Sequence, residues 1–214
     1  MASLGSGPQK RDTYRHGDLR RALVEAGTEL ASEGGPEAVV LREATRRAGV
    51  APSAAYRHFE DRRALLDAVC SAAQAALASA LEEELSGLAD DGNPADAARA
   101  RLRAVGTGYM RFARKEPGLF RTAFSASDNL RSAASSVRAG SGGMTPFQLL
   151  GAALDGLVEA GVLSEGRRPG AEFLAWSAVH GLGMLLIDGP LREFDEATKE
   201  AVGQRLIDMV QRGL

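Results

Sequence analysis

The stretch that decides the fold is residues 41–66, LREATRRAGVAPSAAYRHFEDRRALL. If residues 41–48 are helical, their apolar side chains lie on one face, and this pattern predicts a short helix. Gly49 predicts a turn, because glycine accepts a positive φ without steric cost. Pro52 suits the first position of a second short helix, which we expect over residues 53–58. Two short helices joined by a glycine turn are typical of a helix-turn-helix, whose second helix enters the major groove of DNA.

A cluster of residues in this stretch carries a family resemblance: AGV at 48–50, YRHF at 56–59, and the basic Arg62 followed by Leu65 and Leu66. With these residues the chain resembles the TetR family of bacterial transcription regulators. The resemblance implies an all-α fold of about nine helices, in which an N-terminal three-helix domain with the helix-turn-helix precedes a C-terminal helical bundle. It also implies a double-stranded DNA operator as partner.

Val40 and Ala51 stand where the family usually has Ser or Thr. We therefore expect both short helices to lack a side-chain N-cap, at a cost of roughly 0.5–2 kcal/mol each. Tyr56 and His58 are expected to reach phosphate oxygens, the alternative being that one of them packs against the first helix. Ser53 and Ala54 are small enough to let the helix enter the groove. The residues expected to contact DNA are Arg15, Arg42, Thr45, Arg46, Ser53, Ala54, Tyr56, Arg57, His58 and Arg62.

Helix signals continue along the whole chain, without an alternating pattern long enough for a strand. They predict helices over about 17–32, from the Asp61 cap to 85, 94–115, 117–124, 145–160, 169–187, and from about 195 onwards. Residues 127–143, rich in Gly and Ser, predict a flexible loop. We divide the chain into an N-terminal arm with the helix-turn-helix domain, residues 1–62, and a ligand-binding and dimerisation domain, residues 63–214.

Composition is ordinary for a globular protein: 25% of the 214 residues are charged and 44% are apolar. Residues 1–66 carry 11 Lys and Arg against 9 Asp and Glu, while the remainder carries 15 against 19. A mildly basic front and an acidic rear fit a DNA-binding head on a body that does not touch DNA. The single cysteine, Cys70, forms no intramolecular disulfide, and we expect it to be a small buried residue.

Residues 1–18 are polar and have no apolar segment typical of a signal peptide. The apolar run 173–187 carries no Asp, Glu, Lys or Arg, but it is shorter than the ~20 residues that a membrane span needs. We therefore expect a cytoplasmic protein that does not enter the membrane. The three His and the single Cys are far apart in sequence, so we expect neither a metal site nor a cofactor.

The second half carries another resemblance, in YMRFARKEPGLFRTAF at 109–124 and WSAVHGLGMLL at 176–186. It is similar to the C-terminal domain type named after a Trp-His-Gly signature, here Trp176, His180 and Gly181. The resemblance implies a cavity between the helices for a small apolar or aromatic effector, with plain core packing as the alternative. Its expected lining is Tyr109, Phe112, Phe120, Phe124, Phe147, Leu150, Trp176, His180 and Met184.

The last two helices predict a homodimer interface. The helix over 169–187 is apolar on nearly every side and needs covering on two faces, and small residues permit close helix approach. The alternative is that both helices are buried within one chain. The expected interface residues are Ser177, Gly181, Val202, Leu206, Met209 and Val210.

Together these features predict a ligand-responsive, sequence-specific DNA-binding transcription regulator, a repressor released from its operator by a small apolar molecule. One rival is a protein-interaction module with a vestigial helix-turn-helix, suggested by the missing caps. Another is a small helical enzyme that pairs His180 with Asp188 or Glu172. No nucleophile, base and orienting group can be identified together, so we predict that the protein is not an enzyme.

Overall fold

The computed structural model describes residues 16–89, 92–125 and 135–214, and these residues contain helices and no strand. The α-helices are α1 (His16–Gly34), α2 (Leu41–Arg47), α3 (Pro52–Ala55), α4 (Arg62–Ser86), α5 (Pro94–Lys115), α6 (Pro117–Ala123), α7 (Pro146–Glu159), α8 (Ala171–Ile187) and α9 (Glu196–Gly213). Three 3-10 turns are η1 (Pro36–Ala38), η3 (Ser136–Arg138) and η4 (Glu165–Arg167). The predicted all-α class is confirmed.

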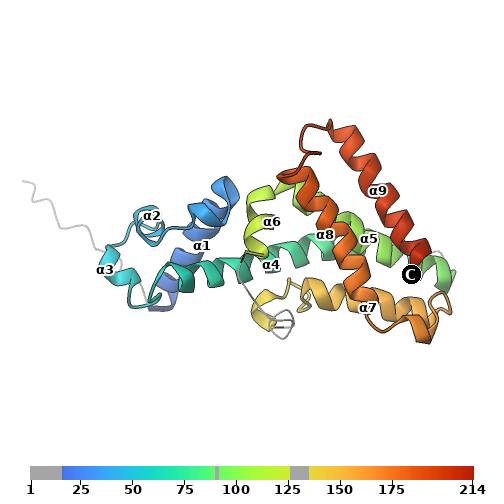
Figure 1. Ribbon diagram of the computed structural model, residues 1–214. Coiled ribbons are helices and arrows are strands. Elements are labelled where there is room, and N and C mark those ends of the chain that lie inside the picture. Colours follow the sequence, from blue (N-terminus) through green and yellow to red (C-terminus); the bar gives the residue numbers. More distant parts are fainter. Residues whose placement is uncertain (1–15, 90–91, 126–134) are drawn as a thin grey trace, which may run out of the picture.

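The molecule has a small head and a larger body joined by α4 (Figure 1). The head consists of α1, α2 and α3, and α4 runs from it into the body, where α5, α6 and α7 pack on it. Helices α8 and α9 pack on α5 and on each other. A single apolar core extends through both parts, from Leu23 in α1 to Ala175 in α8. Movements of the body can therefore reach the head through packed side chains.

Polar side chains start the longer helices where the sequence predicts them. Asp61, Asn93 and Asp195 each accept a hydrogen bond from a first-turn backbone N–H of α4, α5 and α9. Thr145 and Gln148 form a reciprocal capping box at the start of α7. By contrast, no side chain caps α2 or α3, as the residues Val40 and Ala51 predict.

Two boundaries differ from the sequence prediction. The second helix of the helix-turn-helix is a single turn that ends at Ala55, and turns continue the chain to His58. Helix α8 begins two residues after Pro169, because Gly170 adopts a left-handed φ of 80°. The predicted loop over 127–143 lies partly outside the described residues, and its second half contains η3.

The head and body meet along two helices of the body. On α4, Val69 packs so closely on α1 that a Cβ added to Gly27 would lie 2.6 Å from its Cγ2. On α6, a Cβ added to Gly118 would lie 2.2 Å from the carbonyl oxygen of Ala31. Because α4 packs on both parts, the division at residue 62 remains a prediction.

Helix α4 is also long and apolar enough to cross a membrane by length and composition. Its buried residues, which include Leu65, Leu77 and Leu81, pack on other helices of the chain. The core helix of a globular protein has the same properties, so length and composition are weak evidence for a span.

Candidate functional site

The helix-turn-helix is held together by its small and apolar residues. Ala44, Ala55 and Phe59 are buried in the head. Gly49 has a φ of 67°, and an added Cβ there would meet no atom within 4 Å, so the turn requires glycine for its backbone and not for space. Directly after it, the backbone N–H of Val50 donates to the carbonyl oxygen of Thr45 at 3.0 Å, which closes the turn.

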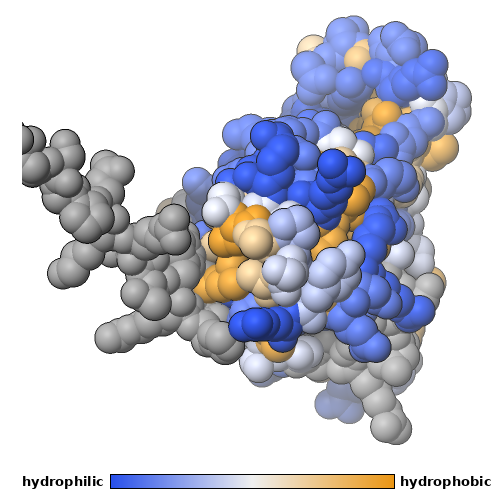
Figure 2. All heavy atoms as spheres, turned by 90° about the vertical axis from the view of Figure 1, so that its left-hand side faces the viewer, coloured by the Kyte–Doolittle hydropathy of each residue, from blue (hydrophilic) through white to orange (hydrophobic). Residues whose placement is uncertain are grey.

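The exposed face of the head carries several of the residues predicted to contact DNA. Tyr56 has 62% of its surface exposed, and Ser53 and Arg57 are also exposed. Ala54 and His58 are partly buried. Figure 2 looks onto this end of the molecule and shows a mainly hydrophilic surface around a small hydrophobic area.

The basic side chains of α2 are exposed to different degrees and have different partners. Arg42 is exposed, whereas Arg46 is bound by Glu43 through two hydrogen bonds. The hydrogen bond from Arg46 lowers the pKa of Glu43. Arg47 donates to Glu33 at 2.9 Å and is bound to α1.

Thr45 needs correction as a predicted DNA contact, and Arg62 has hydrogen-bond partners within the chain, so its contact with DNA remains a prediction. Thr45 has only 1% of its surface exposed, and its hydroxyl donates to the carbonyl oxygen of Arg42 at 2.7 Å. It is a core residue of α2. Arg62 donates from Nε to the carbonyl oxygen of Val39 at 2.8 Å and from Nη2 to that of Pro36 at 2.6 Å. Its guanidinium therefore joins α4 to the α1–α2 connection. Arg15 lies outside the described residues.

The body contains a partly open cavity of about 380 Å³. Six of the nine predicted residues line it: Tyr109, Phe124, Phe147, Leu150, Trp176 and His180. The other lining residues are Gln74, Leu81, Leu102, Val105, Gly106, Ala123, Arg138, Pro146, Ala175, Val179, Ile207, Val210 and Gln211. They come from every helix between α4 and α9 and from η3. The volume lies within the range of small-molecule pockets.

Phe112, Phe120 and Met184 do not line the cavity, which corrects their expected place. Phe120 is fully buried behind the wall, where its ring meets Tyr109 edge-on at a centroid distance of 5.3 Å. Phe112 is buried in the core, and Met184 is partly buried against it.

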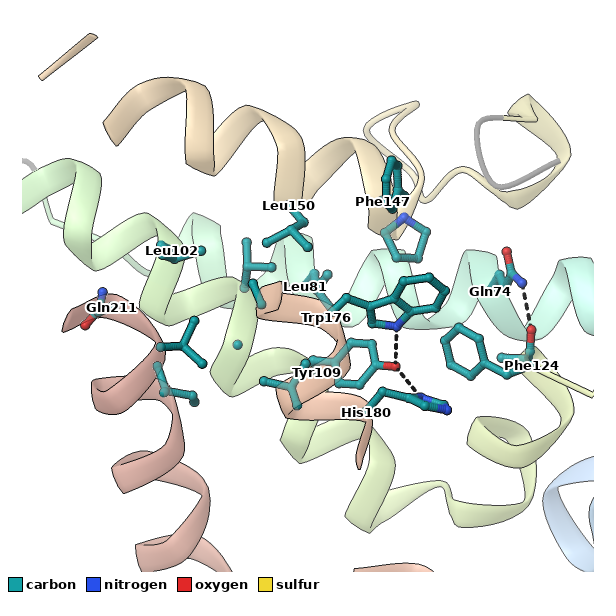
Figure 3. Close-up of a pocket in the computed structure, with 18 of the residues that line it drawn as sticks. Gln74, Leu81, Leu102, Tyr109, Phe124, Phe147, Leu150, Trp176, His180 and Gln211 are labelled. Atoms are coloured by element: carbon teal, nitrogen blue, oxygen red, sulfur yellow. Dashed lines mark hydrogen bonds between the residues drawn. The ribbon is translucent and has the colours of Figure 1, made fainter. Parts of the chain in front are cut away.

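Three polar side chains form a hydrogen-bonded chain in the wall (Figure 3). Trp176 Nε1 lies 3.1 Å from Tyr109 Oη, which lies 2.9 Å from His180 Nδ1. An indole N–H can only donate, so the phenol oxygen accepts from Trp176, and a second hydrogen bond joins the same hydroxyl to His180 Nδ1.

Burial around this chain has the same effect on both titratable groups, since it disfavours their charged forms. It raises the pKa of Tyr109 well above the usual range of a phenol, and the hydrogen bond from Trp176 opposes this only in part. It also lowers the pKa of His180. At neutral pH this wall therefore presents aromatic surface without a net charge.

Sequence reasoning missed both ends of the cavity. Gln74 of α4 and Arg138 of η3 lie at one end, and Gln211 of α9 belongs to the other (Figure 3). Gln74 lies among alanines on a helix assigned only a linking role. Arg138 lies in a segment expected to be a loop. Nothing in the sequence around Gln74 or Arg138 indicates that these side chains face the cavity.

The structure does not have the arrangement of His180 with Asp188 or Glu172 that the enzyme hypothesis requires. His180 is hydrogen-bonded to Tyr109, whereas Glu172 pairs with Arg168 at 2.7 Å and Asp188 lies 3.7 Å from Arg121. The structure therefore does not bring His180 together with either carboxylate. In the described part of the chain, no group of three or more His, Cys, Asp or Glu is placed to hold a metal ion.

The predicted dimer residues divide into two groups. Ser177 and Gly181 are exposed on α8, and Met209 has 56% of its surface exposed on α9. Val202 and Leu206 pack inside the chain on a small cluster with Met110, Leu182 and Leu186, and Val210 lines the cavity. These three are partly buried within the chain, and their place in a dimer interface remains a prediction. Exposed apolar residues that the prediction omitted are Phe173, Leu174 and Leu185 of α8.

Helix α6 connects the cavity wall to the head. Its C-terminal residue Ala123 and the following Phe124 line the cavity. Its first turn lies against the end of α1, where Gly118 faces the carbonyl oxygens of Ala31 and Ser32. Ser32 Oγ also donates to Glu116 just before α6, at 3.0 Å.

Comparison with known proteins agrees with this architecture. Residues 23–69 match the bacterial regulatory proteins of the TetR family, and residues 102–210 match the tetracyclin repressor-like C-terminal domain. The chain belongs to the TetR family, and it is a ligand-responsive DNA-binding transcription regulator. The Trp-His-Gly subtype of the body remains a prediction. A comparison with curated proteins found no match.

Solved structures share the fold over nearly the full length. A protein of unknown function from Rhodococcus sp. RHA1 is 27% identical, with a TM-score of 0.71 over 95% of this chain and 99% of that one. A TetR-family regulator from Pectobacterium atrosepticum is 21% identical, with a TM-score of 0.66 over 95% and 97%. The regulator FadR from Bacillus subtilis, in complex with stearoyl-CoA, is 16% identical, with a TM-score of 0.65 over 91% and 98%.

Proposed function

We propose that this regulator is a repressor, and that it leaves its operator when a small, mainly apolar molecule enters the cavity of the body. The observation that carries the proposal is the position of the cavity. Its wall includes Gln74 and Leu81 of α4 and Ala123 and Phe124 of α6, and both helices pack directly on the head. A ligand that favours another packing of these helices would shift the population of head positions.

The head would contact the operator through its exposed residues. Tyr56, Ser53 and Arg57 follow the turn after Gly49, and Arg42 lies on α2. Phenol and guanidinium groups donate hydrogen bonds to phosphate oxygens, and small side chains permit close approach to the groove. Two heads in a homodimer would reach successive major grooves, roughly 34 Å apart.

The homodimer would form through α8 and α9. Leu174, Ser177, Gly181 and Leu185 recur at helical spacing along the exposed face of α8. Met209 of α9 adds exposed apolar surface. Leu174 alone has 68% of its surface exposed, and burial of such a stripe favours association.

An apolar ligand is proposed from the walls of the cavity. Phe124, Phe147, Leu150 and Trp176 provide aromatic and aliphatic surface, and the hydrogen bonds of Tyr109 and His180 are directed at each other. FadR from Bacillus subtilis, whose crystal structure is a complex with stearoyl-CoA, shares the fold with this protein. That likeness concerns the fold and leaves the ligand to be determined.

Fluorescence anisotropy on a selected operator tests the DNA-binding face. We expect Tyr56→Ala to weaken operator binding by about 1–3 kcal/mol, because an exposed groove contact is lost. Tyr56→Phe removes the hydroxyl and keeps the ring, so it distinguishes the contribution of each to operator binding. Glu60→Gln, at an exposed position in the same segment, is the control and should bind at least as well as the parent.

The salt dependence of binding separates the repressor from a protein-interaction module with a vestigial helix-turn-helix. A DNA-binding head shows an affinity that falls steeply with salt, because bound phosphates release counterions. If no operator can be selected and the affinity for DNA is flat in salt, the repressor proposal fails. Release of operator by a cavity ligand then tests the second half of the proposal.

A further inference from the structure

Most polar side chains of the cavity wall are occupied by bonds within the chain. Gln74 donates from its amide nitrogen to the carbonyl oxygen of Ala123 at 2.7 Å, and its amide oxygen lies 3.5 Å from Nη1 of Arg138. At the other end, Gln211 donates to a backbone carbonyl of α5 at 2.6 Å, and its amide oxygen accepts from Arg103 at 3.0 Å. A ligand would have to break these bonds before it could use the same groups.

His180 differs from the other polar side chains of the wall. Its Nδ1 lies 2.9 Å from Tyr109 Oη, whose other partner is the indole N–H of Trp176. Nε2 of the same ring has no hydrogen-bond partner among the described residues, and it keeps accessible surface. The imidazole therefore brings to the wall of the cavity one polar atom that is open to a ligand.

Aromatic rings surround this polar atom. The ring centroid of His180 lies 4.8 Å from that of Phe124 and 5.5 Å from that of Phe120. Figure 3 shows the imidazole beside Tyr109 and Phe124. Burial lowers the pKa of His180, so the ring is uncharged at neutral pH. An uncharged partner suits it, because burial of a charge without an opposite charge is costly.

We propose that the ligand of this cavity is an uncharged alcohol or phenol, an apolar chain or ring with one hydroxyl group, and that the hydroxyl binds Nε2 of His180. The proposal rests on the proposed function only in taking the cavity as the ligand site. A hydroxyl can donate and accept, so it satisfies Nε2 in either tautomer of a neutral imidazole. The apolar part would lie against Phe147, Leu150 and Trp176, which provide aromatic and aliphatic surface.

This position also brings the polar end of the ligand to the helix that reaches the head. Phe120 lies in α6 and Phe124 directly follows it, and the first turn of α6 packs on α1. A hydrogen bond that draws the imidazole of His180 toward the ligand changes its contacts with both phenyl rings. The hydroxyl would thus act on α6, while the apolar part of the ligand provides affinity.

Titration of the wild-type protein with 4-butylphenol, butylbenzene and 4-butylbenzoate at neutral pH tests the ligand class. The three probes share a butyl-substituted ring and differ in one group, and the single tryptophan, Trp176, reports binding by its emission. We expect 4-butylphenol to bind more tightly than 4-butylbenzoate, because the wall gives the carboxylate no partner of its own. Tighter binding of the benzoate, or no detectable binding of the phenol, overturns the proposal.

A variant of His180 then locates the hydroxyl. Because water solvates the phenol better than butylbenzene, the informative quantity is the ratio of their two dissociation constants in each protein. His180→Phe keeps a ring and removes Nε2, and we expect it to weaken 4-butylphenol relative to butylbenzene by about 2- to 10-fold, the scale of one net hydrogen bond. His180→Leu, with a smaller side chain, serves the same comparison if phenylalanine prevents folding.

Leu150→Ala, in the apolar part of the wall, is the matched control. It should weaken both neutral probes and leave their ratio unchanged, because it removes apolar surface only. Circular dichroism of each variant establishes that it is folded. A folded His180 variant with the wild-type ratio overturns the proposal. Operator binding is measured separately, so a failed repressor assignment is distinguishable from a failed hydroxyl site.

Discussion

The guanidinium of Arg62 is a brace between the start of α4 and the connection that follows α1. It donates to the carbonyl oxygens of Val39 and Pro36, which lie more than twenty residues earlier. Every residue has a backbone carbonyl, so the sequence does not indicate which carbonyls accept a side-chain hydrogen bond. The residues around a basic side chain after the helix-turn-helix are therefore the same whether it binds phosphate or a backbone carbonyl. Thr45 is similar, because its hydroxyl is satisfied inside its own helix by Arg42.

Arg62→Gln distinguishes a brace from a phosphate contact. We expect the free energy of unfolding of the head to fall by about 1–2 kcal/mol, because a fork to two carbonyls is lost. The salt slope of operator binding should stay unchanged, whereas loss of one phosphate contact would reduce it by about 0.9. Arg63→Gln, at the exposed neighbour, is the control for charge. Unchanged stability with a smaller slope would restore Arg62 as a DNA contact.

His180 gives the body a dependence on pH. Burial lowers its pKa, so the native state resists protonation. The unfolded chain takes up that proton near the ordinary value of about 6.5. The contribution of His180 to stability is therefore fully present above that pH, and it is lost as the pH falls from there through the lowered pKa of the native state.

We expect the wild type to lose more stability than His180→Gln when the pH falls from about 7.5 to about 5.5. The ring is partly exposed, so the difference should stay below ~1 kcal/mol. Chemical denaturation at several pH values measures it, with His58→Gln in the head as the control. If wild type and His180→Gln have parallel profiles, burial does not set the protonation of this ring.

At the scale of elements, the local sequence predicts the first residue of a helix better than the last. Asp61, Asn93 and Thr145 have side chains that satisfy first-turn N–H groups, so their sequence fixes where a helix begins. The early end of α3 and the position of η3 depend on contacts with distant helices. No stop residue follows Ala55, although the helix ends there and Ala55 is fully buried.

Gly118 tests whether α6 positions the head. An added Cβ would lie 2.2 Å from the Ala31 carbonyl oxygen and 2.5 Å from that of Ser32, both in the backbone of α1. Gly118→Ala must therefore push α6 away from α1, at a cost of about 1–3 kcal/mol. We expect weaker operator binding without ligand, while the dimer persists in light scattering.

Gly156→Ala is the matched control for this substitution. It lies within α7, and an added Cβ there meets no atom within 4 Å. It should leave operator binding unchanged and slightly stabilise the body, because alanine favours a helix over glycine. If Gly118→Ala lowers stability but binds the operator as the parent does, α6 supports the fold without positioning the head.

At the scale of the whole molecule, the architecture follows from sequence and the details of the cavity follow only in part. Helical spacing places Tyr109, Phe147 and Trp176 on inward faces. It cannot tell a cavity wall from a second layer, and Phe120 belongs to that second layer. Val210 has the spacing of an interface stripe, yet the packing of α9 on α5 directs it into the cavity.

Helical spacing also cannot tell a dimer interface from a buried face of one chain. The exposed apolar residues of α8 allow a test of the interface. The double substitution Leu174→Asp and Leu185→Asp places two charges on the exposed apolar face of α8 and leaves the intramolecular contacts of α9 intact. Because burial of an unpaired charge is costly, we expect monomers at micromolar concentration in light scattering. Operator affinity should fall when the dimer is lost, because the single head of a monomer makes half of the contacts with DNA. Leu88→Asp, an exposed leucine after α4, should remain dimeric. A dimer that survives the double substitution with normal operator binding would move the interface away from α8.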